Sequence, residues 1–518
     1  MPWNIIGTNK HLSEKVMAVD MVVAFLSVVL CLVLGHWYRN RNSSVRIWPV
    51  VGMLPALASN AHGMLDFFTD VLKSNGGTFK IRGPWFPSSD FLVTAHPMNI
   101  NHILCKNHEN YDNALELKQI LEAYDGIVVS NSHVWKRTRK AFLSFFQHNK
   151  KSAAYMDRIL RQVIEGSLVP VLDHFQRLGT EVDLQDVLGR FHYDYMCLLA
   201  IGFDPKTLSV ELPAVEIAEA LRDIDGALVY RNVMPQMIWK LQKWLQIGTE
   251  KKLANGLRIL DDFLYRCIST RRDELRRSEA KAEDRFDALT AFMMEEEGSD
   301  LSELRKSDKF LRDIAYDSLT VAKDSTNIGL TCFLWLLATH PSAETKILEE
   351  IKANCSDEKT VYFNGEELDK FVYLHAALCE SLRLYPSLPL ALRYSKKPDL
   401  LPSGDRVGPD TRIVLSLYSM GRSEEIWGED CMEFKPERWM SEVGEFVQKP
   451  ASLYLPFGVG PRACLGKELS VKMMKTVAIN VVRRYEVKVV EKQKVAMTNK
   501  VLSLTTRHGL KVTLNKRL

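Results

Sequence analysis

One short segment restricts the possible folds of this chain more than any other feature: residues 455–469 read LPFGVGPRACLGKEL. Its glycines and proline favour a tight loop with converging backbone N–H groups, and a helical pattern resumes after Cys464. A cysteine at a helix N-terminus beside Arg462 is expected to have a depressed pKa, and a thiolate is a soft metal ligand. The alternative is a buried structural cysteine. That is our interpretation of the other eight: Cys31, Cys105, Cys197, Cys267, Cys332, Cys355, Cys379 and Cys431.

The composition is that of an ordinary globular protein. Of 518 residues, 46% are hydrophobic and 25% are charged, which excludes wholesale disorder and low-complexity scaffolds. Lys and Arg total 68 against 64 Asp and Glu, and a net charge of +4 gives no reason to expect nucleic acid as a partner. Nine cysteines without a CxxC pair argue against a disulfide framework or a zinc site, and favour a reducing compartment.

An apolar run near the N-terminus is long enough to span a bilayer as a helix. Three arginines follow it closely and two lysines precede it, which favours a cytosolic C-terminal side. A cleaved signal peptide and a buried core helix are the alternatives, but bulky residues stand where a cleavage site needs small ones. We expect a lumenal N-terminus at 1–15, a membrane anchor at 16–38, a basic and proline-containing linker at 39–60 and one soluble body at 61–518.

Most of the body has helical periodicity, over 113–124, 134–146, 153–175, 215–221 and 257–275. Extended segments are few: 78–81 is expected to pair with 91–94, and 501–505 with 510–514 through a hairpin turn at His508-Gly509, next to 486–490. A long apolar helix is expected from about 309 to 339, with a polar island at 323–327. Buried polar groups are costly unless paired, so the island is either a water-satisfied kink or an acid–alcohol pair lining a cavity.

The segment around Cys464 resembles the haem-binding motif FxxGxRxCxG of the cytochrome P-450 superfamily, at Phe457, Gly460, Arg462, Cys464 and Gly466. The resemblance implies a mainly α-helical cytochrome P-450 fold, a large helical domain plus a small β-rich region, with one N-terminal transmembrane helix. It also implies haem b, held axially by the Cys464 thiolate, with Phe457, Arg462 and Gly466 as cofactor-binding residues.

Three further motifs match the family and stand in the family's order along the chain. Glu380 and Arg383 form an ExxR pair, and Arg438 lies in KPERW. An ExxR pair alone would be interpreted as a surface ion pair, but the resemblance implies a buried structural network of all three. Trp135 and Arg139 match a WxxxR helix, which implies contacts to a haem propionate. Arg393 is expected to contact a propionate as well.

The polar island aligns with the family's oxygen-activation motif, (A/G)Gx(D/E)T, which here reads VAKDS. Asp324 keeps the acid and Ser325 replaces the threonine, so the resemblance implies a catalytic proton relay through both. Ala322 replaces a glycine and adds a methyl group where oxygen must fit. This departure favours an unusual chemistry.

Segments such as LRLYPSLP resemble the plant clan of fatty-acid and alkane hydroxylases. FDPKTLSVELP is closest to its mid-chain alkane hydroxylase branch, which also contains noroxomaritidine synthase-type phenol-coupling enzymes of Amaryllidaceae. Because coupling needs hydrogen abstraction rather than oxygen insertion, the altered motif favours intramolecular C–C phenol coupling of a norbelladine-type alkaloid precursor. Mid-chain or terminal hydroxylation of long-chain alkanes or fatty acids is the alternative. Two further alternatives are a haem-thiolate isomerase and a non-catalytic membrane haem protein.

The resemblance also implies partners and a location. NADPH electrons would arrive through a membrane-bound NADPH–cytochrome P-450 reductase, with O2 as co-substrate, at the endoplasmic reticulum membrane with a cytosolic catalytic domain. A basic patch of Lys136, Arg137, Lys140 and Lys467 is expected to dock the reductase. A small apolar or phenolic substrate is expected to contact 127–129, the helix face around Leu319 and Ala322, 388–392 and 502–506.

Overall fold

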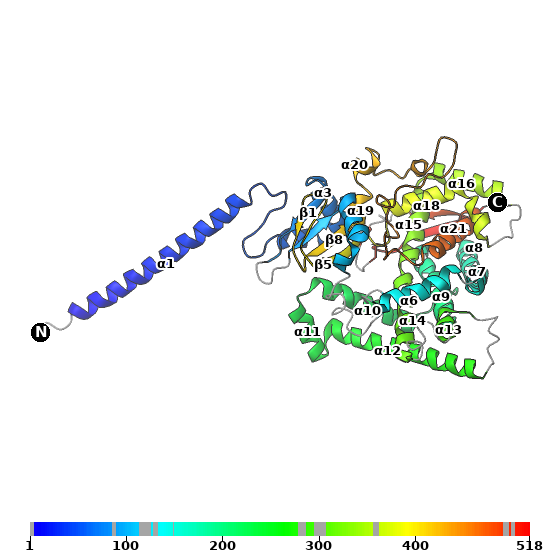
Figure 1. Cartoon of the computed structure of the whole chain (residues 1–518), viewed down its shortest axis with the longest axis horizontal. Helices are drawn as coiled ribbons and strands as arrows, with labels where there is room; N and C mark the ends of the chain where they lie inside the picture. The colour runs from blue at the N-terminus through cyan, green and yellow to red at the C-terminus, as the bar shows by residue number, and fades with distance from the viewer. Residues whose placement is uncertain are drawn as a thin grey trace.

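The computed structural model describes residues 5–84, 90–112, 126–127, 133–148, 150–277, 286–294, 307–355, 362–490, 497–498 and 503–517. The first helix, α1 (Ile5–Arg39), extends away from the rest of the chain (Figure 1). Its residues Asp20–Arg39 form the one helix in the described part of the chain that is long and apolar enough to cross a membrane. Just beyond it, the Arg46 guanidinium lies over the rings of Trp37 and Trp48, at 4.8 and 4.7 Å, as is typical of a membrane–water boundary.

Helices make up most of the body. Their bounds are α2 (Leu54–Ser59), α3 (Met64–Lys73), α4 (Pro97–Asn101), α6 (His133–Leu143), α7 (Lys150–Val163), α8 (Val169–Leu178), α9 (Leu184–Ile201), α10 (Glu216–Val233), α11 (Gln236–Leu245), α12 (Gly248–Arg276), α13 (Ala288–Met293), α14 (Asp308–Lys323), α15 (Ser325–Thr339), α16 (Pro341–Asn354), α17 (Gly365–Asp369), α18 (Val372–Leu384), α19 (Leu417–Met420), α20 (Glu424–Trp427) and α21 (Lys467–Arg484).

The helix α9 lies at the centre of the helical region and is buried on nearly every side. It packs against α7, α13, α14 and α15. The Asp183 carboxylate caps its start by accepting from the N–H groups of Gln185 and Asp186, and Gly202 ends it in the left-handed conformation. Because α9 is apolar around its circumference, it has little amphipathic periodicity, and the sequence pattern did not predict it.

The five-stranded sheet lies at the end of the body nearest α1 (Figure 1). Its order is β1 (Thr78–Ile81), β2 (Phe91–Thr94), β8 (Arg412–Ser416), β5 (Leu390–Ser395) and β3 (Tyr111–Asp112). The predicted pairing of 78–81 with 91–94 is confirmed, in the antiparallel register Thr78↔Thr94. The strand β2 pairs parallel with β8, and the other pairs are antiparallel.

Three smaller sheets complete the strands. The first has the order β4 (Val182–Asp183), β12 (Lys511–Lys516) and β9 (Tyr485–Val489). The others pair β6 (Asp399–Leu400) with β7 (Arg406–Val407) and β10 (Met497–Thr498) with β11 (Thr505–Thr506). The predicted hairpin through His508-Gly509 was therefore wrong. Leu510 donates its N–H to the Asp183 carboxylate, which directs the C-terminal strand to β4 and β9 instead.

The helix predictions held in part. The segment 134–146 falls on α6 and 153–175 on α7 and α8 with a π-helical turn between them, while α10 and α12 are longer than predicted. The segment 113–124 lies outside the described residues. The predicted helix at 309–339 is two helices, α14 and α15, which meet at Asp324.

The short helix α11 exposes an apolar face to solvent. Met237 and Trp244 are 84% and 78% exposed, and Leu241 is 55% exposed. In the view of Figure 1, α11 lies on the side of the body from which α1 extends. Soluble proteins rarely leave such a contiguous apolar patch uncovered.

Candidate functional site

The loop around Cys464 doubles back on itself. Cys464 donates its backbone N–H to the Phe457 carbonyl at 2.8 Å, and Ala463 donates to the Gly460 carbonyl at 3.0 Å. Gly460 has a φ of +78°, and a Cβ there would overlap the Leu104 carbonyl oxygen, so this position requires glycine. Gly466 then caps α21. The Cys464 side chain stands exposed at the end of this loop.

The predicted depression of the Cys464 pKa was wrong. Desolvation by the surrounding chain raises the pKa of this thiol, although the Gly466 N–H and the nearby Arg139 guanidinium act in the opposite direction. Local sequence shows the N–H donors and the arginine, but it does not show the desolvation by surrounding chain that opposes them. A thiol in this setting becomes a thiolate when a cation binds it, because the bound cation supplies the compensating charge.

Arg139, Arg462 and Arg393 form a group of coupled charges beside the Cys464 loop, in a desolvated setting. The Arg462 guanidinium stacks over the Trp135 ring at 4.4 Å, and Arg139 donates to the Ala463 carbonyl at 2.7 Å. Desolvation lowers the pKa of all three, that of Arg393 to about 10, and the charge of Arg462 adds to the effect on Arg139 and Arg393. The Asp112 carboxylate, 3.9 Å from Arg462, acts in the opposite direction and raises the pKa of Arg462 and Arg393.

This donor set fits a haem. A soft sulfur ligand is accessible in Cys464, and a group of mutually repelling guanidinium groups beside it would be stabilised by two carboxylates. Trp135 shares this region, since both Arg139 and Arg462 lie over its ring. The predicted cofactor-binding residues Trp135, Arg139, Arg462 and Cys464 are thus neighbours in the structure, and electrostatic repulsion links Arg393 to Arg462.

Glu380, Arg383 and Arg438 meet in a buried cluster. The side chains of Glu380 and Arg383 are 0% and 1% exposed, and that of Arg438 is 12% exposed. Arg383 donates to both Glu380 oxygens at 2.7 Å, and Arg438 donates to one of them at 3.3 Å. Sequence reasoning missed two further members: Trp439 donates its indole N–H to Glu380 at 2.9 Å, and Asp430 accepts from Arg438 at 2.7 Å.

The acid–alcohol pair lies where α14 ends and α15 begins. Asp324 has φ −103° and ψ −27°, and Ser325 is the first residue of α15. One residue later, the Thr326 hydroxyl donates to Ser470 at 3.3 Å, and Ser470 lies in the first turn of α21, just after the Cys464 loop. The break therefore faces the part of the chain that carries Cys464. The placement of the Ala322 side chain lies outside what the structure describes.

The predicted substrate-contact segments are only partly described, since 128–129 and 502 are not. Leu319 is fully buried in a hydrophobic cluster with Ile314 and Ala315, so it packs in the core. Sequence reasoning missed Asp317, which is 2% exposed and accepts the Ile127 N–H at 2.6 Å. It lies seven residues before Asp324, hence two turns away on the same helix face. In the predicted docking patch, Lys136, Lys140 and Lys467 are exposed.

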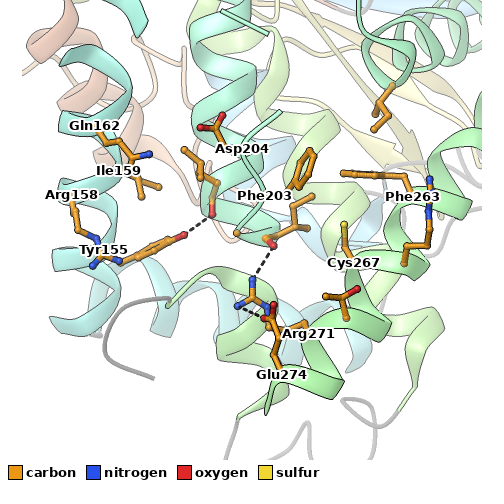
Figure 2. Close-up of a pocket in the computed structure, with 16 residues that line it drawn as sticks. Tyr155, Arg158, Ile159, Gln162, Phe203, Asp204, Phe263, Cys267, Arg271 and Glu274 are labelled. Carbon is orange, nitrogen blue, oxygen red and sulfur yellow. Dashed lines mark hydrogen bonds and ion pairs between the residues drawn. The ribbon is translucent and has the colours of Figure 1, made fainter. Parts of the chain in front are cut away.

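A separate cavity of about 830 Å³ lies between α7, the end of α9 and α12 (Figure 2). Tyr155 donates to the Leu198 carbonyl at 2.9 Å and Arg271 to the Ile201 carbonyl at 3.3 Å, so both satisfy the C-terminal end of α9. None of the predicted site residues lines this cavity. We therefore place the chemistry at Cys464.

Comparison with known proteins agrees with this site. The cytochrome P-450 family model matches residues 43–514. Alkane hydroxylase MAH1 of Arabidopsis thaliana is 36% identical over 501 residues, which cover 96% of this chain and 99% of the relative. Cytochrome P-450 86B1 of the same plant is 36% identical over 96% of this chain and 90% of the relative. Noroxomaritidine synthase 1 of Narcissus pseudonarcissus is 33% identical over 95% of this chain and 96% of the relative. The chain therefore belongs to the cytochrome P-450 family and is a P-450 monooxygenase.

Proposed function

We propose that this monooxygenase hydroxylates a long-chain alkane or fatty acid at a mid-chain or terminal carbon. The observation that carries the proposal is the break at Asp324–Ser325, where an acid and an alcohol are adjacent in the chain next to α21. Insertion of oxygen requires directed protons, and this pair can supply them. The first residue of α15 is a hydroxyl in place of the family's threonine, so the relay chemistry is retained.

The residues of the site divide the work. When haem is bound, Cys464 would supply the thiolate ligand, and Arg139, Arg393, Arg462 and Trp135 would hold its propionates. Bound haem supplies the activation of O2. Glu380 and its partners hold the core beneath the site and take no part in the reaction. Electrons come from NADPH through a separate flavoprotein reductase, which docks on the basic patch while α1 anchors the chain in the endoplasmic reticulum membrane.

Intramolecular phenol coupling of a norbelladine-type precursor is the second candidate. It is supported by the 33% identity to noroxomaritidine synthase 1 over 95% of the chain. The sequence argument ranked it first, because Ala322 and Ser325 suggested relaxed demands on oxygen insertion. The adjacent acid and alcohol at the break support a proton relay, and a relative named as an alkane hydroxylase is 36% identical. Hydroxylation therefore takes precedence.

The test uses microsomes that contain the full chain and a plant reductase, supplied with NADPH. Hexadecane, hexadecanoic acid and norbelladine are offered in parallel, and product masses are measured. Gain of one oxygen on either lipid supports hydroxylation. Loss of two hydrogens from norbelladine, with both lipids unchanged, contradicts it and supports coupling. Cys464→Ser is the control that removes the thiolate, and products that persist in it do not arise at this site.

A further inference from the structure

Ser387 touches the break between α14 and α15 from a distant part of the chain. It follows α18 and is 8% exposed. Its hydroxyl donates to the Ser325 carbonyl at 2.5 Å. Its own carbonyl accepts the Leu504 N–H at 2.9 Å. One residue therefore joins the start of α15 to the C-terminal segment, and it immediately precedes the 388–392 segment.

The position of this hydrogen bond matters because Ser325 opens a helix. A carbonyl oxygen has two lone pairs, so it can accept a side-chain hydroxyl in addition to a helical N–H. Side chains that enter the hydrogen-bond ladder of a helix are a known cause of kinks. The Ser387 hydroxyl bonds the carbonyl of the first residue of α15, directly after Asp324.

The packing around this point leaves the first turn of α15 little room to move. A Cβ added at Gly329 would lie 3.0 Å from the Met474 sulfur and 3.8 Å from the Ser387 hydroxyl oxygen. Thr326 bonds Ser470 on the same helix as Met474. Ser387 and α21 thus contact this turn from different parts of the chain, and the Ser387 bond is made to Ser325 itself.

We propose that Ser387 is a positioning residue for the oxygen-activation pair. Its hydroxyl fixes the peptide that follows Ser325, and this sets the direction in which the Asp324 and Ser325 side chains present their protons. The inference rests on the proposed relay role of these two residues. Without the hydrogen bond, proton delivery loses its direction. More NADPH and O2 are then consumed as NADPH + O2 + H⁺ → NADP⁺ + H2O2, with no oxygen entering a substrate.

The test compares Ser387→Ala with two other variants. Ser387→Thr keeps the hydroxyl. Ser381→Ala is the matched control, because Ser381 is also buried and its hydroxyl has no hydrogen-bond partner among the residues that the structure describes. Amide exchange over residues 326–329 is measured on the full chain in detergent. A single neutral hydrogen bond is worth about 0.5–1.5 kcal/mol, so exchange in Ser387→Ala is expected to be about 2- to 12-fold faster. The other two variants are expected to match the wild type.

The second measurement is the fraction of consumed NADPH that appears as H2O2, with reductase and hexadecanoic acid present. We expect this fraction to rise at least about twofold in Ser387→Ala and not in Ser387→Thr or Ser381→Ala. Equal exchange in Ser387→Ala and Ser381→Ala would overturn the positioning role. Faster exchange with an unchanged H2O2 fraction would overturn its link to proton delivery. A wild-type chain that forms no oxygenated lipid counts against the proposed substrate, while the exchange comparison still decides the role of Ser387.

Discussion

Replacing Glu380 with glutamine is expected to cost this protein a large part of its stability. The carboxylate is completely buried and accepts hydrogen bonds from Arg383, Arg438 and the Trp439 indole. The glutamine has nearly the same shape but no charge, so it leaves the fully buried Arg383 without its counter-ion. Breaking a buried ion pair from one side costs about 3–5 kcal/mol, against a total stability of about 5–15 kcal/mol for a typical folded protein.

The assay is urea unfolding of the full chain in detergent, followed by circular dichroism. The matched control is Glu424→Gln, which removes a carboxylate paired with Lys73 at 2.7 Å where both side chains are more than half exposed. Such exposed pairs contribute at most about 1 kcal/mol. The reasoning fails if the free energy of unfolding of Glu380→Gln falls by less than about 1 kcal/mol, or by no more than that of the control.

Three further outcomes are expected. Asp317→Asn should speed amide exchange at Ile127, because the Asp317 carboxylate accepts the Ile127 N–H. Asp313→Asn, on the same helix, should leave that exchange unchanged. Equal exchange rates at Ile127 in the two variants would contradict the contact. Burial, with help from Lys475 and Lys467, lowers the pKa of His375 to about 4. The unfolded chain therefore binds a proton that the folded chain does not, and stability should fall as the pH drops from about 6.5 to 4; thermal unfolding of His375→Gln should show a weaker decline in that window. Finally, if α11 contacts lipid, brominated lipid in nanodiscs should quench a smaller share of tryptophan fluorescence in Trp244→Phe than in wild type.

Local motifs predicted much of the fold because the contacts that they imply join residues that are close in sequence. The i, i+3 spacing of Glu380 and Arg383 brings both side chains to one helix face wherever that helix lies. The glycines before Cys464 require a turn with positive φ in any tertiary setting. The strand pair at 78–81 and 91–94 is likewise close in sequence. The assignment of Trp135, Arg139 and Arg393 to haem contacts stays a prediction. The structure places Trp135 and Arg139 next to the Cys464 loop and links Arg393 to Arg462 by charge repulsion.

What sequence could not supply depends on distant residues. The raised pKa of Cys464 comes from desolvation by the chain folded around the loop, which no neighbouring residue reveals, although the side chain itself remains accessible. The polar island at 323–327 indicated a kink as one alternative, and α14 and α15 do meet there, but nothing in the local pattern indicates the bond from the Ser387 hydroxyl to the Ser325 carbonyl. The C-terminal strand does not form the predicted hairpin. The Asp183 carboxylate accepts the Leu510 N–H, and the strand pairs with β4 and β9. Each of these is a tertiary contact that overrides a correct local preference.

The parallel pairing of β2 with β8 determines how late in synthesis the five-stranded sheet can be completed. Residues 91–94 leave the ribosome early, and their partners at 412–415 leave it late. Meanwhile β2 has one edge without its final neighbour, and α1 already holds the chain at a membrane. Cys464 follows later still, so haem can be bound only when almost the whole polypeptide has emerged. A chain that stops after α18 would keep its anchor and an open strand edge, and would be prone to aggregate at the membrane surface.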